Sequence, residues 1–299
     1  MTDATNMFFM GKGGVGKSTA AALNSLFLAQ KGFQVLIVSL DPAHNQSDIF
    51  ETSLSDKPTK IADNLMGIEI DQDYWIRRYL KDVQNQIKRT YSYLTAFNLE
   101  KYFEVIKYSP GLEEYALILV FKDIMQKFGH LDFLMFDMPP TALGLRFFTL
   151  PTLSLIWIEK LVALRKEIIK KEVETDKILN KINEMKKDYQ GLKDIFEDCE
   201  QTHINLVLNP DKLSLAESTR IVEALHDINI TCSQIINNKM QLHSSCDDIN
   251  TAFSDIPICQ CPYSETPLIR LTNLEQFLKA NDSVLEEQVN HLLPSATEK

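Results

Sequence analysis

The chain has 299 residues, of which 44% are hydrophobic and 24% are charged, and these proportions exclude wholesale disorder. Its formal net charge of −10 argues against nucleic acid as the main partner, because neutralising phosphates requires a basic surface. No run of apolar residues reaches the roughly 18 that a membrane-spanning helix needs. The amino terminus lacks the basic segment of a signal peptide and the five cysteines fit reduced thiols, so we expect a cytoplasmic protein.

Short apolar runs alternate with long helical stretches along the chain. Most of the runs are continuous rather than alternating, which is typical of strands buried on both faces of a parallel sheet. Repeated strand–helix–strand units predict an α/β fold with a doubly wound, mostly parallel sheet. The predicted strands are Met7–Met10, Gln34–Leu40, Leu65–Ile70, Leu131–Asp137, His203–Leu208, Ile230–Asn237 and Asp255–Cys259.

Two helices carry clear end signals. The first is expected to start at Gly16–Lys17–Ser18 and to end at Lys31–Gly32, where a basic last turn meets a glycine stop. The last is expected to open at Ser283, because Ser283 and Glu286 fit a capping box.

Two helical stretches, about residues 71–128 and 152–202, are too long for simple crossovers. We therefore predict one domain, residues 1–299, with a helical subdomain formed by the two insertions. In the second insertion, two sets of apolar residues recur in steps of three and four: Trp157, Leu161, Leu164 and Ile168, then Ile182, Met185, Tyr189, Leu192 and Phe196. This spacing predicts a hairpin of amphipathic helices whose stripes face the core, and the alternative is a client-binding surface.

The most informative segment matches the phosphate-loop pattern G-x-x-x-x-G-K-[ST] between a predicted strand and a predicted helix. Its residues are Gly11, Lys12, Gly13, Gly14, Val15, Gly16, Lys17, Ser18 and Thr19. Glycines let successive backbone N–H groups turn toward phosphate oxygens, and the helix N-terminus adds positive potential. We expect Lys17 to reach the β- and γ-phosphates of ATP and the Ser18 hydroxyl to ligate Mg²⁺.

Two aspartates follow predicted strands at the edge where a doubly wound sheet binds nucleotides. Asp41 comes after the second strand and is placed to orient or deprotonate the attacking water. Asp137 comes after four hydrophobic residues and fits a carboxylate that holds Mg²⁺ through water or through Ser18. The sequence therefore predicts an ATP-hydrolysing, Mg²⁺-dependent enzyme.

Lys12 is not required by an ordinary phosphate loop, and Lys-Gly-Gly-x-Gly-Lys-Ser resembles the deviant Walker A class. In that class the extra lysine reaches across a dimer interface to the partner's nucleotide. The resemblance implies a symmetric homodimer in which Lys12 neutralises charge that develops during phosphoryl transfer.

The segment Asp41-Pro42-Ala43-His44-Asn45, together with the loop, resembles one family: the arsenite-pump (ArsA) ATPases and their relatives that target tail-anchored membrane proteins. The second switch differs from the family's commoner Asp-Thr-Ala-Pro-Thr-Gly-His, because this chain has Asp137-Met138-Pro139-Pro140-Thr141-Ala142-Leu143. Switch II coupling is therefore expected to differ in this branch.

The resemblance extends along most of the chain. Glu69–Asp71, Pro110–Glu114 and Leu213–Arg220 are similar to further family motifs. The resemblance implies that Asn238 reads the adenine, with Asn237 as a one-residue register alternative, because an amide offers both a donor and an acceptor. Pro262 ends the segment that matches the family's adenine-side loop.

The identity of the client divides the family. Arsenite pumps bind metalloids through thiolates, and Cys259-x-Cys261 places two thiols on one face of an extended segment, although buried thiols are the plainer interpretation. His243 and Cys246 stand where the targeting ATPases often carry Cys-x-x-Cys, so two subunits together would offer a His₂Cys₂ zinc site.

Three functional classes follow. The first is an ATP-driven homodimer that closes on ATP and acts on an anion or protein client at the helical subdomain. The second is a targeting factor or chaperone for tail-anchored or other helical membrane-protein clients, with a membrane protein as a further partner. The third, a positioning ATPase, is disfavoured because the carboxyl terminus carries acidic residues instead of a basic amphipathic tail.

Overall fold

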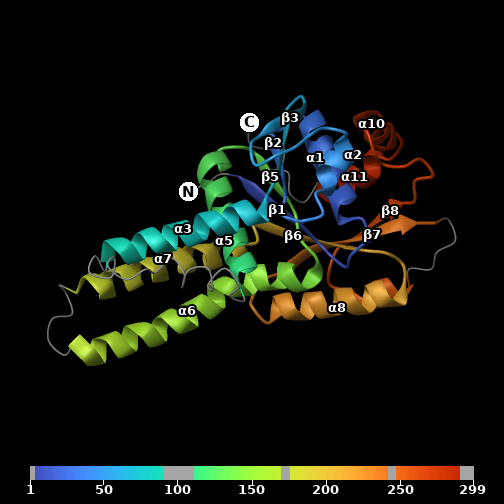
Figure 1. Ribbon diagram of the computed structural model, residues 1–299. Coiled ribbons are helices and arrows are strands. Elements are labelled where there is room, and N and C mark those ends of the chain that lie inside the picture. Colours follow the sequence, from blue (N-terminus) through green and yellow to red (C-terminus); the bar gives the residue numbers. More distant parts are fainter. Residues whose placement is uncertain (1–3, 91–110, 170–175, 242–246, 290–299) are drawn as a thin grey trace, which may run out of the picture.

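The computed structural model describes residues 4–90, 111–169, 176–241 and 247–289, which are organised around a central β-sheet (Figure 1). Within these residues the sheet has eight strands in the order β3-β4-β2-β5-β1-β6-β7-β8. Neighbouring strands run parallel except β3 and β4, so the predicted α/β fold is confirmed. The strands are β1 (Thr5–Met10), β2 (Val35–Ser39), β3 (Thr59–Ala62), β4 (Leu65–Glu69), β5 (Phe133–Asp137), β6 (Thr202–Leu208), β7 (Cys232–Met240) and β8 (Ile258–Pro262).

The edge strand β3 was not predicted. It is four residues long, only half-buried, and forms an antiparallel hairpin with β4 through a turn in which Asn64 has a φ of +60°. A strand this short shows no recognisable hydrophobic period.

The boundaries of β8 also differ from the prediction. It begins at Ile258 instead of Asp255, because a turn in which the Ile256 N–H donates to the Phe253 carbonyl occupies the predicted first residues.

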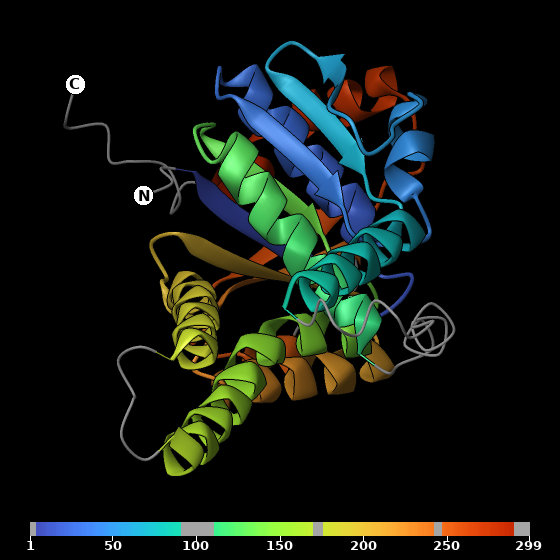
Figure 2. The same cartoon turned by 60° about the vertical axis from the view of Figure 1, so that its left-hand side comes forward.

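Helices cover both faces of the sheet (Figure 2). One face is packed by α1, α2, α10 and α11, and the other by α3, α5, α6, α7 and α8. The helices are α1 (Lys17–Gln30), α2 (Asn45–Phe50), α3 (Gln72–Thr90), α5 (Leu112–Phe128), α6 (Thr141–Ile169), α7 (Lys177–Glu197), α8 (Lys212–His226), α9 (Asp247–Ala252), α10 (Leu271–Ala280) and α11 (Asp282–Val289).

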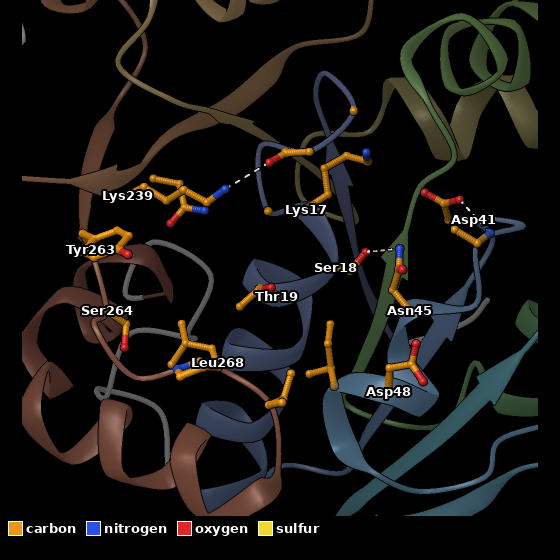
Figure 3. A pocket seen from close by; sticks show the side chains of 18 of the residues that line it. Lys17, Ser18, Thr19, Asp41, Asn45, Asp48, Lys239, Tyr263, Ser264 and Leu268 are labelled. Carbon is orange, nitrogen blue, oxygen red and sulfur yellow. Dashed lines mark hydrogen bonds between the residues drawn. The ribbon is translucent and has the colours of Figure 1, made fainter.

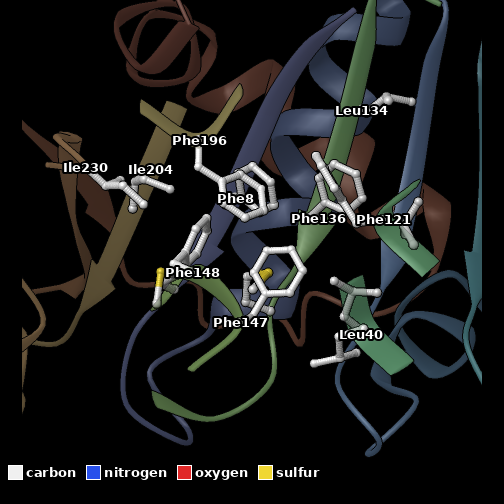
Figure 4. Close-up of a cluster of buried hydrophobic side chains, with 14 of the residues drawn as sticks. Phe8, Leu40, Phe121, Leu134, Phe136, Phe147, Phe148, Phe196, Ile204 and Ile230 are labelled. Carbon is white, nitrogen blue, oxygen red and sulfur yellow. The ribbon is translucent and has the colours of Figure 1, made fainter. Parts of the chain in front are cut away.

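A cluster of phenylalanines fixes α5, α6 and α7 against the middle of the sheet (Figure 4). The Phe8 and Phe136 rings, on neighbouring strands, stack with centroids 4.8 Å apart. Phe121, Phe148 and Phe196 bring the three helices onto these rings at tilted or edge-on angles. Aromatic pairs in such orientations contribute more stability than their buried area alone would give. This cluster therefore anchors the sheet-facing parts of α5, α6 and α7.

The ends of the first helix agree with the prediction and those of the last do not. Helix α1 begins at Lys17 and ends before Lys31–Gly32, where Gly32 has a φ of +98°. Helix α11 begins at Asp282, because the Asn281 carbonyl accepts the N–H groups of the first turn; the predicted capping box at Ser283 is therefore wrong.

Helices α6 and α7 form the predicted hairpin, which projects beyond the sheet (Figure 1). Ion pairs join the two helices, from Lys186 to Glu159 at 2.8 Å and from Arg165 to Asp176 at 2.6 Å. The Asp176 side chain also caps α7 by accepting the Leu179 N–H.

The expected core-facing stripe of α6 is wrong. Trp157 is 63% exposed, Leu164 is 57% exposed and Leu161 is only half-buried, whereas Leu155 and Ile158 are buried instead; the side chain of Ile168 lies outside the described part. On α7 the stripe is buried only near the sheet, at Leu192 and Phe196. We call the residues Leu153, Ile156, Trp157 and Leu164 the exposed α6 face.

Residues Thr141–Glu167 within α6 are long and apolar enough to cross a membrane by length and composition, and 33% of the most apolar window is buried. The sequence analysis missed this stretch because scattered polar residues interrupt every continuous apolar run. A core helix of a soluble protein passes the same test, so the finding is weak by itself.

Candidate functional site

A cavity of about 640 Å³ lies beside the phosphate loop (Figure 3). The loop and the start of α1 form one wall, and the segment after β2 forms another. The end of β7 and residues 262–269 close the remaining side. A parallel sheet binds its ligands at the carboxyl ends of its strands, which is where these segments meet.

At two glycines of the phosphate loop an added side chain would collide with neighbouring atoms. Gly11 has a φ of +142°, and a Cβ there would collide with the Val207 carbonyl. Gly16 has a φ of +101°, and a Cβ there would collide with the Asn238 amide. These two glycines let the loop turn tightly between β1 and α1. Gly13 and Gly14 have open space around them and are exposed toward solvent, but Gly14 has a φ of +82°, which also favours glycine.

Helix α1 points its N-terminus into the cavity, and Lys17, Ser18 and Thr19 line it as predicted. The first N–H groups of a helix lack intrahelical partners and carry partial positive charge, so they favour a phosphate. Lys17 is largely buried and adds a full positive charge. Gly13, Gly14 and Gly16 line the cavity as well, whereas the predicted Gly11 and Val15 are buried and do not.

The two predicted aspartates lie near each other at the ends of neighbouring strands, since β2 and β5 are paired in register up to Ser39 and Asp137. Asp41 lines the cavity and its Oδ1 accepts the Ala43 N–H at 3.0 Å. Asp137 is fully buried, and its Oδ2 accepts a hydrogen bond from Gln46 Nε2 at 2.9 Å. Burial raises the pKa of the Asp137 carboxyl to about 6, against the lowering effect of the Gln46 hydrogen bond and of the nearby Ser18 hydroxyl.

Asp137 and Ser18 fit a magnesium site. Asp137 Oδ1 is buried without a hydrogen-bond partner among the described residues, and an unsatisfied buried carboxylate oxygen is strongly unfavourable. Mg²⁺ prefers oxygen ligands and commonly keeps several waters. A cation held by the Ser18 hydroxyl and, through water, by Asp137 would satisfy this oxygen.

The two predicted asparagines, at the end of β7, differ in their position relative to the cavity. Asn238 lines it and donates from Nδ2 to the Val15 carbonyl at 2.8 Å. Asn237 is fully buried and donates to Gln260 Oε1 at 2.8 Å, away from the cavity. The predicted Pro262 also lines the cavity. Of the two asparagines, Asn238 is therefore the one that lines the cavity, and its role toward adenine stays a prediction.

The sequence analysis missed three residues at this site. Lys239 donates from Nζ to the Gly14 carbonyl at 3.0 Å, and Tyr263 lines the cavity beyond it (Figure 3). Gln46 bridges α1 and β5 from α2. Each lies close in sequence to a residue that had been singled out, but only the tertiary structure shows their contacts.

Lys12 is half-buried and is not among the described residues that line the cavity of its own chain. This position leaves its predicted role toward a partner's nucleotide open to experiment. His243 and Cys246, the predicted zinc ligands, lie outside the described residues, as does Pro110. Across the described residues, no group of three or more His, Cys, Asp and Glu side chains could hold a metal ion.

The thiol pair of β8 is buried. Cys259 and Cys261 are 3% and 5% exposed, and burial raises their pKa values to about 11 and about 12. Neutral, buried thiols are poor ligands for an arriving metalloid, since the thiolate is the form that binds. The structure therefore supports the plainer interpretation of this pair.

Acidic residues of two family-like motifs hold the segment after Asp137. Thr141, at the start of α6, donates to Glu217 on α8 at 2.6 Å. Arg146, one turn further on, pairs with the buried Glu114 on α5 at 3.1 Å. The second switch is thus tied to both neighbouring helices.

The sequence is similar to known ATPases, which is consistent with a phosphate-binding site at this cavity. The sequence profile of the anion-transporting ATPase family matches residues 4–280. "Putative arsenical pump-driving ATPase 2" from Aquifex aeolicus is 28% identical, over 91% of this chain and 97% of the relative. An "ATPase ASNA1 homolog" from Plasmodium vivax is 31% identical, over 78% of this chain and 63% of the relative.

Proposed function

Because the chain belongs to the anion-transporting ATPase family, we propose that it hydrolyses ATP in a Mg²⁺-dependent reaction at the cavity beside the phosphate loop. The observation that carries the proposal is the buried Oδ1 of Asp137, which has no hydrogen-bond partner within the described ranges and lies next to Ser18 and Lys17. Mg²⁺ held by the Ser18 hydroxyl and, through water, by Asp137 would neutralise charge that develops on the phosphates.

The residues of this chain would divide the remaining work. The loop N–H groups and Lys17 hold the β- and γ-phosphates, and Asn238 offers its amide to the adenine. Asp41 orients the attacking water and accepts its proton, and its burial beside the loop suits this task. Lys12 from a second copy neutralises charge that develops during phosphoryl transfer, so the active form is a homodimer.

The proposal is tested by phosphate release from ATP by the purified full chain, with Mg²⁺ and with EDTA. Turnover is expected only with Mg²⁺, and Asp41→Asn should bind ATP normally while losing turnover. Absence of turnover in the wild-type protein would contradict the proposal, and persistent turnover in Asp41→Asn would contradict the role of that carboxylate.

We further propose that this chain is cytoplasmic and that its ATP-driven closure acts on an anion or protein client bound at its own α6–α7 hairpin. The exposed α6 face favours this, because large apolar side chains in solvent commonly mark a binding surface. The second candidate is that this chain is a targeting factor or chaperone whose client is the helical segment of a tail-anchored or other membrane protein, since an apolar helix packs well on such a face.

Two titrations separate the client classes. Apolar helical peptides should shift the fluorescence of the exposed Trp157, and Sb(III) without reducing agent should leave the ATPase rate unchanged. A several-fold stimulation by Sb(III) that disappears in Cys259→Ser/Cys261→Ser would instead assign a metalloid client.

A further inference from the structure

Gln46 occupies a position that the proposed reaction does not explain. It lies on α2, in the segment that follows Asp41, and is fully buried. Its Nε2 donates to the Ser18 carbonyl at 3.0 Å and to Asp137 Oδ2 at 2.9 Å. One amide thus connects the segment that begins at Asp41 and includes α2, which we call the first switch, to both residues that fit the magnesium site.

The orientation of this amide is fixed by its partners. Both contacts are acceptors, so the NH₂ group must face them; a flipped amide would set its carbonyl against two oxygens. Gln46 Oε1 has no hydrogen-bond partner within the described part of the chain. The side chain therefore holds Asp137 Oδ2 in place and leaves Asp137 Oδ1 as the carboxylate oxygen without a partner in that part of the chain.

A second buried acid anchors the same short helix from its other side. Glu69, on β4, accepts the Ser47 N–H at 2.8 Å and the Ser47 hydroxyl at 2.5 Å. The Ser47 hydroxyl in turn accepts the Leu54 N–H at 3.0 Å. Helix α2 is thus held between β4 and β5, with Gln46 directed at the metal-ligating pair and Ser47 directed away from it.

We propose that Gln46 is a positioning residue that orients the Asp137 carboxylate for Mg²⁺ and ties that orientation to the first switch. This inference rests on the proposed function, because it concerns the metal of that reaction. Residues that orient a ligand of a metal commonly change its affinity ten- to a hundredfold when removed. The hydrogen bonds of the Gln46 side chain go to Ser18 and Asp137 rather than to the loop glycines or Asn238, so nucleotide binding without metal should not depend on it.

The test measures binding of a fluorescent, non-hydrolysable ATP analogue in EDTA and in Mg²⁺, so the readout is separate from turnover. In Gln46→Met, which keeps the shape and removes the amide, affinity in EDTA should match the wild type. The gain in affinity on adding Mg²⁺ should fall about tenfold or more. Gln34→Met is the matched control, since Gln34 is exposed just before β2, at the opposite end of that strand from Asp41, and its side chain donates to Asn64.

Gln46→Asn gives an independent variant if Gln46→Met does not fold. It keeps the amide but withdraws it by about 1.5 Å, one C–C bond, so the same loss of the Mg²⁺-dependent gain is expected. A wild-type gain in either folded variant would overturn the inference. A wild-type protein without any Mg²⁺-dependent gain would refute the proposed function instead.

Discussion

Asp137→Asn should stabilise the nucleotide-free protein while abolishing its activity. Asp137 is fully buried, and burial raises the pKa of its carboxyl from the ordinary 3.8 to about 6. A carboxyl whose folded pKa is raised stabilises the fold fully below its unfolded pKa, and that stability is lost as the pH rises through the folded pKa. The shift of about 2 pKa units corresponds to about 3 kcal/mol of destabilisation at pH 8.

The amide that Asp137→Asn introduces carries no charge, so the substitution removes this penalty. Its new N–H group needs an acceptor, and an unsatisfied donor would offset part of the gain by about 1–3 kcal/mol. We therefore expect a net gain of at most about 2 kcal/mol at pH 8 that shrinks as the pH falls from 7 toward 4. Urea unfolding without nucleotide or Mg²⁺ measures it at each pH.

Asp48→Asn is the matched control, because Asp48 also lines the cavity but is exposed. Its free energy of unfolding should change by less than about 0.5 kcal/mol. The reasoning would be refuted if Asp137→Asn were less stable than the wild type at pH 8, or if its gain in stability did not depend on pH. Either result would show that the ionised Asp137 carboxylate does not destabilise the metal-free fold.

Three further outcomes follow from the geometry. Gly16→Ala should weaken ATP binding about tenfold or more by equilibrium titration, because a Cβ at φ +101° is strained and meets Asn238; normal affinity would contradict the loop geometry. Phe136→Ala should lower the free energy of unfolding by about 3–5 kcal/mol in urea, and a loss below about 1 kcal/mol would contradict the packed cluster. Thiol reagents at pH 8 should label the exposed Cys199 first and spare the two cysteines of β8 until the pH approaches their raised pKa values; rapid labelling of that pair would show that β8 is accessible.

The phosphate loop could be predicted because its chemistry is local. Consecutive glycines, one lysine and one serine fix the backbone path between a strand and a helix, and the structure gathers Lys17 and Ser18 as expected. Asp41 and Asp137 were also predictable, since the ends of parallel strands meet at one edge of the sheet.

Other features depend on tertiary packing. A helical period gives the phase of an apolar stripe but not what covers it, so the core-facing prediction for Trp157 and Leu164 was wrong. The contacts of Gln46 and Lys239 join segments far apart in the chain, so no local sequence pattern predicts them. Strand β3 was too short to show a period.

The central claim is hydrolysis at a site completed by a second copy of the chain. Lys12→Ala and Asp41→Asn should each be inactive as pure proteins, because one lacks the lysine for the partner's site and the other lacks the carboxylate of its own site. A mixed dimer keeps one intact site, formed by Asp41 of the first variant and Lys12 of the second.

The most direct measurement is therefore the ATPase rate after the two inactive variants are mixed in equal amounts and allowed to exchange subunits. Half of the dimers would be mixed, each with one of two sites intact, so about a quarter of the wild-type rate should return. A mixture that remains as inactive as its components, although subunit exchange is verified, would contradict the paired site.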